Sequence, residues 1–313
     1  MRNLRVSEIL IVGLAALAAA LGQADAPPSP RRLYGEPVRT LAVSPNGRTI
    51  ALGTERIIRL VAIDGKPIVQ LVGHQQAVVH LCFSPDGDTL ASAAEPGDPS
   101  PMQLWAMATH QPIRRWGNAD RCIRGLAFTP DGQQLAVVEP DAVTLHNPRL
   151  GRFSAELPVP PRWTDLNRVA VSPDGKSLAI GCDTGRRATF DIIDRTVKYA
   201  GSAPGASLAI QYHPDNRRLI WADAYDLHLC DDDGNVVPFA AQRLLNITAI
   251  AQTSNGTRLA IARGPDLTVW DIATRTLQAT LTGHRRDIRS LAFAGSQTLV
   301  SAGDDGAMIW HVP

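Results

Sequence analysis

Residues 78–92 read VVHLCF, then SPDG, then DTLAS, which is an apolar run, a tight turn and a second apolar run. Pro85 fixes its own φ for the turn, and the Asp86 side chain accepts a hydrogen bond from the backbone two residues further on. Gly87 adopts the left-handed conformation that closes a hairpin at little steric cost. Because the turn reverses the chain between two short runs rich in β-forming residues, the stretch predicts two antiparallel, buried strands.

The same turn recurs along the whole chain. Close copies lie at 44–47, 129–132 and 172–175, and weaker copies at 213–216, 253–256 and 293–295. The central turn positions, from residue 46 to residue 295, are 40, 45, 43, 41, 40 and 40 residues apart. A third strand is expected to end at Val61, Trp105, His146, Phe190, Cys230, Trp270 and Trp310. A more polar fourth strand follows, as at 67–71 and 277–281, so the pattern predicts seven units of four antiparallel strands.

Units of about 40 residues with four antiparallel strands are typical of β-propeller blades, whose apolar faces stack on one another. We therefore expect an all-β protein, a seven-bladed β-propeller of four-stranded antiparallel blades, with residues 31–313 as its single folded domain. The last unit stops at Pro313 just after its third strand, and residues 31–34 precede the first innermost strand. Residues 31–34 are expected to supply the missing strand, since two sheet edges would otherwise stay open.

Several motifs are similar to those of WD-repeat proteins. In the second unit, Gly73-His74 is followed by the turn at 84–87, by Leu90-Ala91-Ser92 and by Trp105. In the seventh unit, Gly283-His284 is followed by Leu299-Val300-Ser301, Asp304-Asp305-Gly306 and Trp310. Trp270-Asp271 is the dipeptide after which the family is named. The chain resembles a divergent member of this family from about Arg31 onward, and the family shares the closing N-terminal strand.

The resemblance implies two structural tetrads, each with a His before the first strand, a Ser in the second strand, an Asp in the next turn and the third-strand Trp. They are His74, Ser92, Asp98 and Trp105 in the second unit, and His284, Ser301, Asp305 and Trp310 in the seventh. His, Ser and Asp also form catalytic triads, but no nucleophile elbow surrounds these serines. We therefore expect a structural role for both sets, no catalytic residues and no enzyme activity.

Composition excludes several classes of protein. Of the 313 residues, 44% are apolar and 19% charged, which is too hydrophobic for a disordered chain. The formal net charge is +1, so no excess of positive charge would hold a nucleic acid or an anionic lipid surface.

The first thirty residues have the pattern of an export signal. Arginines at positions 2 and 5 precede an uncharged apolar run over 9–21, and small residues follow. We predict a signal peptide over 1–24 with cleavage near Ala24 or Ala26, then a short Pro-rich linker over 25–30. The run is shorter than the roughly 20 residues of a spanning helix, so a stable membrane anchor is disfavoured. The expected location is the bacterial periplasm or the secreted fraction, with an N-terminally membrane-anchored protein as the alternative.

No metal or cofactor is expected. The eight His residues include no pair at metal-binding spacing, and the four Cys residues form no CxxC pair. The distance between the strand levels of Cys82 and Cys122 exceeds the limit for a disulfide, so four free, mostly buried thiols are predicted. The run 231–235 lacks the alternating oxygen ligands and closing Glu of a calcium loop, and it is interpreted as a solvated hairpin turn.

The loops that enter the innermost strands should ring one mouth of the central channel. Alignment on the turns places Arg39, Arg124, Asn167 and Arg289 at one equivalent position, and Asp165 and Asp287 just before it. A rim of arginines and aspartates suits recognition of carboxylates on a partner, although ordinary solvated rim charges would give the same pattern.

We expect a noncatalytic protein-protein interaction platform, a monomeric propeller within a complex, that binds an unidentified protein or peptide at this rim. One alternative is an enzyme with a metal in its channel, similar to lactonases or quinoproteins, which gather acidic and His residues there. Another is a structural subunit that resembles the propeller of the Tol-Pal envelope complex. That propeller carries an additional N-terminal domain, for which the few residues before the first strand leave no room.

Overall fold

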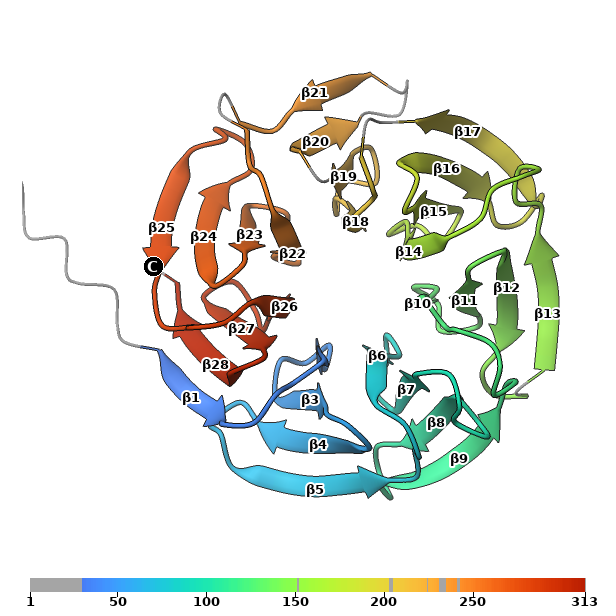
Figure 1. Cartoon of the computed structure of the whole chain (residues 1–313), viewed down its shortest axis with the longest axis horizontal. Coiled ribbons are helices and arrows are strands. Elements are labelled where there is room, and N and C mark those ends of the chain that lie inside the picture. The colour runs from blue at the N-terminus through green and yellow to red at the C-terminus, as the bar shows by residue number, and fades with distance from the viewer. Residues whose placement is uncertain are drawn as a thin grey trace, which may run out of the picture.

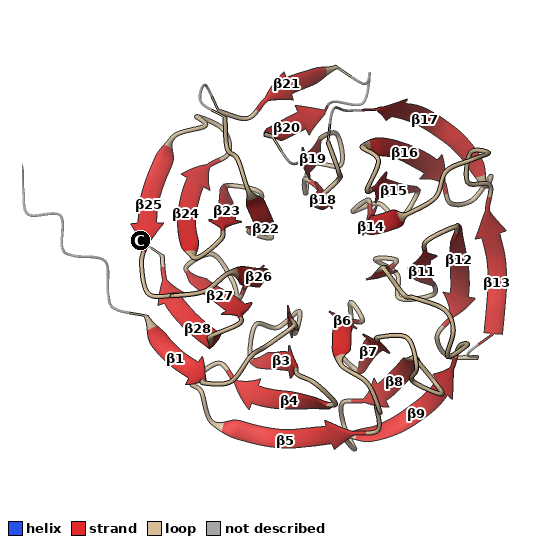
Figure 2. Cartoon of the chain, in the orientation of Figure 1, coloured by secondary structure: helices blue, strands red, loops and turns tan. Residues whose placement is uncertain are grey.

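The computed structural model describes residues 30–150, 152–202, 205–223, 225–230, 235–240 and 243–312. Its elements are strands, and they form seven four-stranded sheets arranged as blades around a central channel (Figures 1 and 2). This confirms the predicted fold of seven four-stranded antiparallel blades. The predicted signal peptide, most of the linker and the run 231–234 lie outside the described residues. Within the described ranges, no helix is long and apolar enough to cross a membrane.

The strands of each blade run from the channel outward. Blade one contains β2 (Thr40–Val43), β3 (Thr49–Gly53), β4 (Ile57–Ala62) and β5 (Pro67–Val72). Blade two contains β6 (Val78–Phe83), β7 (Thr89–Ala94), β8 (Met102–Ala106) and β9 (Gln111–Trp116). Blade three contains β10 (Gly125–Phe128), β11 (Leu135–Glu139), β12 (Ala142–Asn147) and β13 (Arg152–Leu157). Blade four contains β14 (Leu166–Val171), β15 (Ser177–Cys182), β16 (Arg186–Asp191) and β17 (Thr196–Ser202).

The remaining blades follow the same order. Blade five contains β18 (Ala209–Tyr212), β19 (Leu219–Ala222), β20 (Leu227–Cys230) and β21 (Val236–Pro238). Blade six contains β22 (Ile247–Gln252), β23 (Arg258–Arg263), β24 (Asp266–Asp271) and β25 (Leu277–Leu281). Blade seven contains β26 (Ile288–Phe293), β27 (Thr298–Gly303), β28 (Gly306–His311) and, at its outer edge, β1 (Arg31–Tyr34).

The recurring turn is built by side-chain to backbone hydrogen bonds. In blade two, Asp86 Oδ1 accepts hydrogen bonds from the Ser84 hydroxyl at 2.5 Å and from the Asp88 amide at 3.1 Å. The Gly87 amide donates to the Ser84 carbonyl oxygen at 2.9 Å, and Gly87 has a φ of +79°. The hydrogen bond from Ser84 and that from the Asp88 amide lower the pKa of Asp86. The turn residues therefore set the hairpin, and with it the register of the inner strands.

Stability comes from packing of each blade on the next. Between blades one and two, the Leu60 and Leu71 side chains pack with Leu81, Leu90 and Trp105 in one buried cluster. Each fully buried side chain of this size contributes about 1.5–3 kcal/mol relative to an exposed one. The four cysteines are free thiols, of which two are buried and two half-buried.

The N-terminal strand closes the ring. β1 pairs antiparallel with β28, with Arg31 opposite Ile309 and Arg32 opposite Met308. In Figure 1 this blue strand lies at the outer edge of the red C-terminal blade. The Arg32 guanidinium also donates to the Asp305 carbonyl oxygen at 2.7 Å. The predicted closure is confirmed, and residues more than 270 positions apart share one sheet.

Removal of residues 30–34 should lower the free energy of unfolding by several kcal/mol, because it exposes the edge of β28 and unlocks the ring. Chemical denaturation of a chain that starts at residue 35 measures the loss. A chain that starts at residue 30 is the matched control and should be much more stable. Equal midpoints for the two chains would contradict the role of β1.

Candidate functional site

The channel opens into a cavity of about 540 Å³, lined by residues at the start of the innermost strands and in the loops that enter them. In Figure 1 the innermost strands of the blades surround the centre of the ring. The charged and titratable residues of the lining are Arg39, Arg124, Arg168, Arg289, Asp287 and His80. All seven blades contribute to the lining, and five of them supply its charged and titratable residues.

Four of the six residues expected at the rim line this cavity: Arg39, Arg124, Asp287 and Arg289. The Arg289 guanidinium makes two hydrogen bonds to Asp304, of 2.6 and 2.9 Å, which lower the pKa of the Asp304 carboxyl. Arg39 lies 3.9 Å from the Glu95 carboxylate. The side chains of Arg39 and Arg289 stay 39% and 45% exposed, so both remain accessible to a partner.

The structure places Arg168, not Asn167, against the channel. A β-bulge between Leu166 and Arg168 leaves Asn167 without a partner in β15. The same bulge occurs at Val79 in blade two and at Arg289 in blade seven, and both of those residues line the cavity. The hydrogen bonds of Asn167, and not the bulge, therefore distinguish it. Asn167 is buried, and its Nδ2 donates to the Asp183 carboxylate and to the Ser207 carbonyl oxygen.

The other expected rim residue of blade four also lies outside the cavity lining. The carbonyl oxygen of Asp165 accepts a hydrogen bond from the Asp183 amide, and its side chain accepts one from the Thr164 hydroxyl. Asp165 adopts a φ of +59°, in the left-handed region that aspartate tolerates in turns. Together with Asn167, it shapes the entry loop of blade four.

Arg168 is held in place by backbone carbonyls. Its Nε donates to the Leu208 carbonyl oxygen of blade five at 2.5 Å, and its Nη1 donates to the Asn167 carbonyl oxygen at 2.7 Å. Alignment of the repeated turns placed Asn167 at the rim of blade four, and it therefore missed Arg168, the next residue along the chain. A charged residue inside a predicted inner strand was the available signal.

His80 also faces the cavity and is uncharged at neutral pH. Burial lowers its pKa to about 4, and the positive charges of Arg168 and Arg124 act in the same direction. The lining therefore carries four arginines and one aspartate, a formal excess of three positive charges. This set attracts anions and repels metal cations. In the described part of the chain, no three His, Cys, Asp or Glu side chains are grouped to hold a metal ion.

The structure brings the residues of both expected tetrads together. In blade two, His74 Nδ1 lies 3.1 Å from the Asp98 carboxylate and His74 Nε2 lies 2.7 Å from Ser92 Oγ. Trp105 Nε1 donates to Ser92 Oγ at 2.9 Å. Burial lowers the pKa of His74 more than the Asp98 carboxylate raises it.

Blade seven repeats the arrangement with shorter distances. His284 lies 2.6 Å from Asp305 Oδ1 and 2.7 Å from Ser301 Oγ, and Trp310 Nε1 donates to Ser301 Oγ at 2.7 Å. Ser92 and Ser301 are fully buried, so a substrate cannot reach their hydroxyls. Both networks join the loop before the first strand to the second and third strands of their blade.

The geometry defines a class: the chain is a seven-bladed β-propeller built from repeated blades, two of which carry the His-Ser-Asp-Trp network. The family model described as "WD domain, G-beta repeat" matches residues 65–98 and 275–311. Those ranges hold most of the first network and all of the second. The protein is therefore a seven-bladed β-propeller that contains WD40 repeats.

Two curated proteins are similar to parts of this chain. An uncharacterized WD repeat-containing protein of Synechocystis, sll1491, is 30% identical over 95 residues, 30% of this chain and 27% of that protein. Protein HIR1 of Kluyveromyces lactis is 24% identical over 187 residues, 50% of this chain and 21% of that protein. This chain thus spans about a quarter of the length of the curated relatives it matches.

Among solved structures, the β-propeller domain of Cps50 (Swd1) from Myceliophteria thermophila matches with a TM-score of 0.78. The match covers 91% of this chain and 99% of that domain, at 17% sequence identity. At this identity the similarity shows a common fold.

Replacing Ser301 with Ala should lower the free energy of unfolding by about 2–3 kcal/mol, because His284 Nε2 and Trp310 Nε1 both lose a buried partner. The exposed Ser296, in the shortened turn of the same blade, gives a matched control, and Ser296→Ala should change stability by less than about 0.5 kcal/mol. Denaturant titration measures both variants. A Ser301→Ala protein as stable as the control would show that the network does not stabilise the blade.

Lowering the pH from 7 to 4 should destabilise the wild type more than His80→Gln. Since the folded-state pKa of about 4 lies below the usual value of 6.5, the unfolded chain binds the additional proton between these values. The stabilisation is complete above about pH 6.5 and disappears toward pH 4, with a difference on the order of 2 kcal/mol.

Thermal unfolding at a series of pH values measures this difference between the His80→Gln variant and the wild type. His311→Gln, at an exposed position in β28, is the control and should follow the wild-type profile. Identical pH profiles for His80→Gln and the wild type would contradict the burial of a neutral His80.

Proposed function

We propose that the protein is a noncatalytic interaction platform that binds an acidic segment of a partner protein at the cationic channel mouth. Propellers with WD40 repeats are typically protein-interaction scaffolds, which supports the class of function. The observation that carries the proposal is the convergence of four arginines from four blades on one cavity. An arginine guanidinium matches the geometry of a carboxylate, and its charge-assisted hydrogen bonds are about twice as strong as neutral ones.

The two arginines at the edge of the cavity suit reversible binding. Arg289 and Arg39 are partly neutralised by Asp304 and Glu95, yet both side chains are more than one-third exposed. A partner carboxylate can therefore bind either arginine beside its acidic neighbour or in place of that neighbour. Little desolvation of the arginine is needed, because it is already paired and partly exposed. Such pairs contribute specificity and association rate more than affinity.

The proposal includes the compartment. Residues 1–24 have the charge and apolar pattern of a signal peptide, and we propose that the propeller acts after export, in the periplasm or outside the cell. Residues 31–313 would then form the mature domain, as a monomer within a larger complex. The partner sought is an exported or envelope protein with an exposed acidic segment.

Combined reversal of charge at Arg39, Arg124 and Arg289 to Glu should abolish crosslinking of the tagged protein to its partner in the cells of origin after compartment fractionation. Carboxylates on the partner would then meet three like charges. Recovery of the tagged protein in the periplasmic or secreted fraction is expected, and recovery in the cytoplasm would contradict the proposed export.

Three exposed arginines away from the cavity, Arg48, Arg152 and Arg195, provide a control with the same change in net charge. The control variant should keep the wild-type crosslinks, and thermal unfolding shows that both triple variants are folded. Equal crosslinks in both triple variants would exclude the channel mouth as the docking site.

A further inference from the structure

The interface between blades four and five differs from the other six in the residues that the third strand presents to the next blade. In the third strand of every blade, two side chains face the next blade. They stand three residues and one residue before the position that Trp105 occupies in blade two. The pairs in blades one, two, three, five, six and seven are apolar: Ile58/Leu60, Met102/Leu104, Val143/Leu145, Leu227/Leu229, Leu267/Val269 and Ala307/Ile309. In blade four the pair is Arg187/Thr189 on β16.

Arg187 is a buried cation that has no carboxylate partner among the residues that the structure describes. It is 6% exposed, and its guanidinium carbon lies 4.1 Å from the centre of the Trp221 ring of blade five. Its Nη2 donates a long hydrogen bond of 3.4 Å to the Tyr199 hydroxyl. Among the side chains that the structure describes, Arg187 alone has two buried donors, Nε and Nη1, with no acceptor.

The neighbouring indole adds a third donor to this layer. Trp221 stacks on His228 with ring centroids 4.0 Å apart, and the Arg187 guanidinium contacts the same indole. Trp221 Nε1 is also buried without an acceptor in the described part of the chain. This layer therefore presents three hydrogen-bond donors that need an acceptor.

The fourth strand of blade four, β17, has a small residue opposite Arg187 and so leaves space beside its side chain. Arg187 pairs with Gly201 of β17 across the sheet, where the equivalent partners in blades one, two, three and six are large. Those partners are Leu71, Trp116, Leu157 and Leu281. A Cβ on Gly201 would collide with the Tyr199 side chain, so the glycine lets Tyr199 turn toward Arg187.

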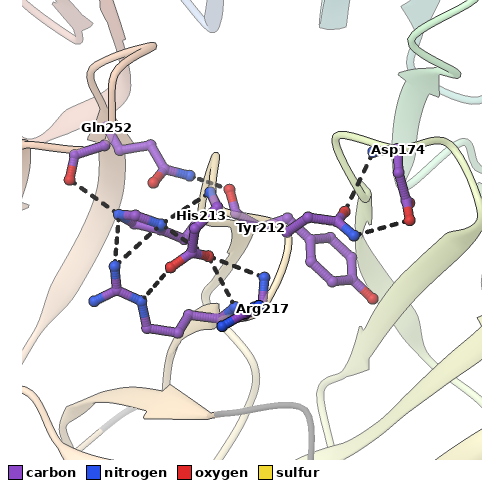
Figure 3. A network of polar contacts seen from close by, with 9 residues as sticks. Asp174, Tyr212, His213, Arg217 and Gln252 are labelled. Carbon is purple, nitrogen blue, oxygen red and sulfur yellow. Dashed lines mark hydrogen bonds and ion pairs between the residues drawn. The ribbon is translucent and has the colours of Figure 1, made fainter.

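These replacements accompany a cavity of about 470 Å³ between the two blades. Among the described residues of its lining, the charged ones are Arg187, Lys176, Lys198, Arg217 and Asp174, a formal excess of three positive charges. Lys198 also forms an ion pair of 3.0 Å with Asp191, which lies outside the lining. Figure 3 shows Asp174 of blade four facing the turn of blade five that carries His213 and Arg217.

Asp174, the one carboxylate among the described residues of the lining, is already satisfied. Asp174 accepts hydrogen bonds from the Ser172 hydroxyl at 2.6 Å, from the Lys176 amide at 3.0 Å and from Asn216 Nδ2 at 2.8 Å. Burial raises the pKa of Asp174, but these hydrogen bonds outweigh it and the pKa lies below its usual value. Asp174 is therefore anchored at the turns and does not neutralise Arg187.

We propose that this cavity binds a small molecule bearing a polyvalent oxyanion, a phosphate or a carboxylate group, through Arg187. A buried guanidinium without a counter-charge is destabilising, and six equivalent positions of the same chain show that an apolar residue fits there. An anion supplies the acceptors that Arg187 needs and neutralises the excess charge. The site is separate from the channel mouth, so this proposal is tested independently of the proposed function.

The test is thermal unfolding of the full chain with sodium pyrophosphate or sodium citrate, at an ionic strength held constant with sodium chloride. Either anion at a concentration about 100 times its dissociation constant should raise the Tm of the wild type by about 4 °C or more. A response to pyrophosphate alone identifies a phosphate ligand, and a response to citrate alone identifies a carboxylate. No response to either anion overturns the proposal.

Arg187→Met tests the residue itself, because methionine occupies the equivalent position in blade two. This variant should unfold at or above the wild-type temperature without the anion, and the anion should no longer raise its Tm. Arg186→Met, at the exposed neighbouring position of the same strand, is the control and should keep the full response. A response of Arg187→Met equal to that of the control would overturn the proposal.

Calorimetric titration with the responding anion gives a second readout that does not depend on the stability of the variant. Arg187→Met should lose at least about tenfold in affinity, and Arg186→Met should keep the wild-type value. Should Arg187→Met fail to fold, Lys198→Met removes a second cation of the lining and should weaken binding. Unchanged affinity in Lys198→Met would then overturn the proposal.

Discussion

Burial of the two apolar faces of every blade is the constraint on which the rest of the structure depends. A four-stranded blade cannot cover its own faces, so each blade needs a neighbour on both sides. A linear stack would leave two faces and two sheet edges exposed, and only a ring removes both. β1 completes the ring by pairing with β28, and a buried cluster that includes Val38, Leu41, Val300 and Ala302 joins blades seven and one.

The ring also explains where charged residues collect. Equivalent positions at the start of each innermost strand face the same axis, so side chains far apart in sequence become neighbours. Solvent in the channel lets arginines stand there without disturbing the packing between blades. The cationic cavity is thus a consequence of repetition combined with a few local substitutions, such as Arg124 and Arg168.

The interface between blades four and five shows what happens when the packing rule is relaxed. Arg187 replaces an apolar side chain and Gly201 replaces a large one, yet the neighbouring pairs on β14, β15 and β18 keep the two blades in contact. Because the other six interfaces remain apolar, the ring tolerates one polar layer. A repeat protein can therefore carry a polar cavity in one interface while the others maintain its fold.

The number of blades, their strand order and the closing strand could be predicted from the amino-acid sequence, because Pro, Asx and Gly act locally at each turn. It also placed the two His-Ser-Asp-Trp sets, whose members recur at fixed distances from those turns. Only the folded structure shows that Arg168 and not Asn167 faces the channel, since the partners of Asn167, the Asp183 carboxylate and the Ser207 carbonyl oxygen, lie on other segments of the chain. Only the folded structure shows that Arg187 is buried without an acidic partner among the described residues. Its burial and its contact with Trp221 depend on the neighbouring blade, which the spacing of residues in the sequence does not describe.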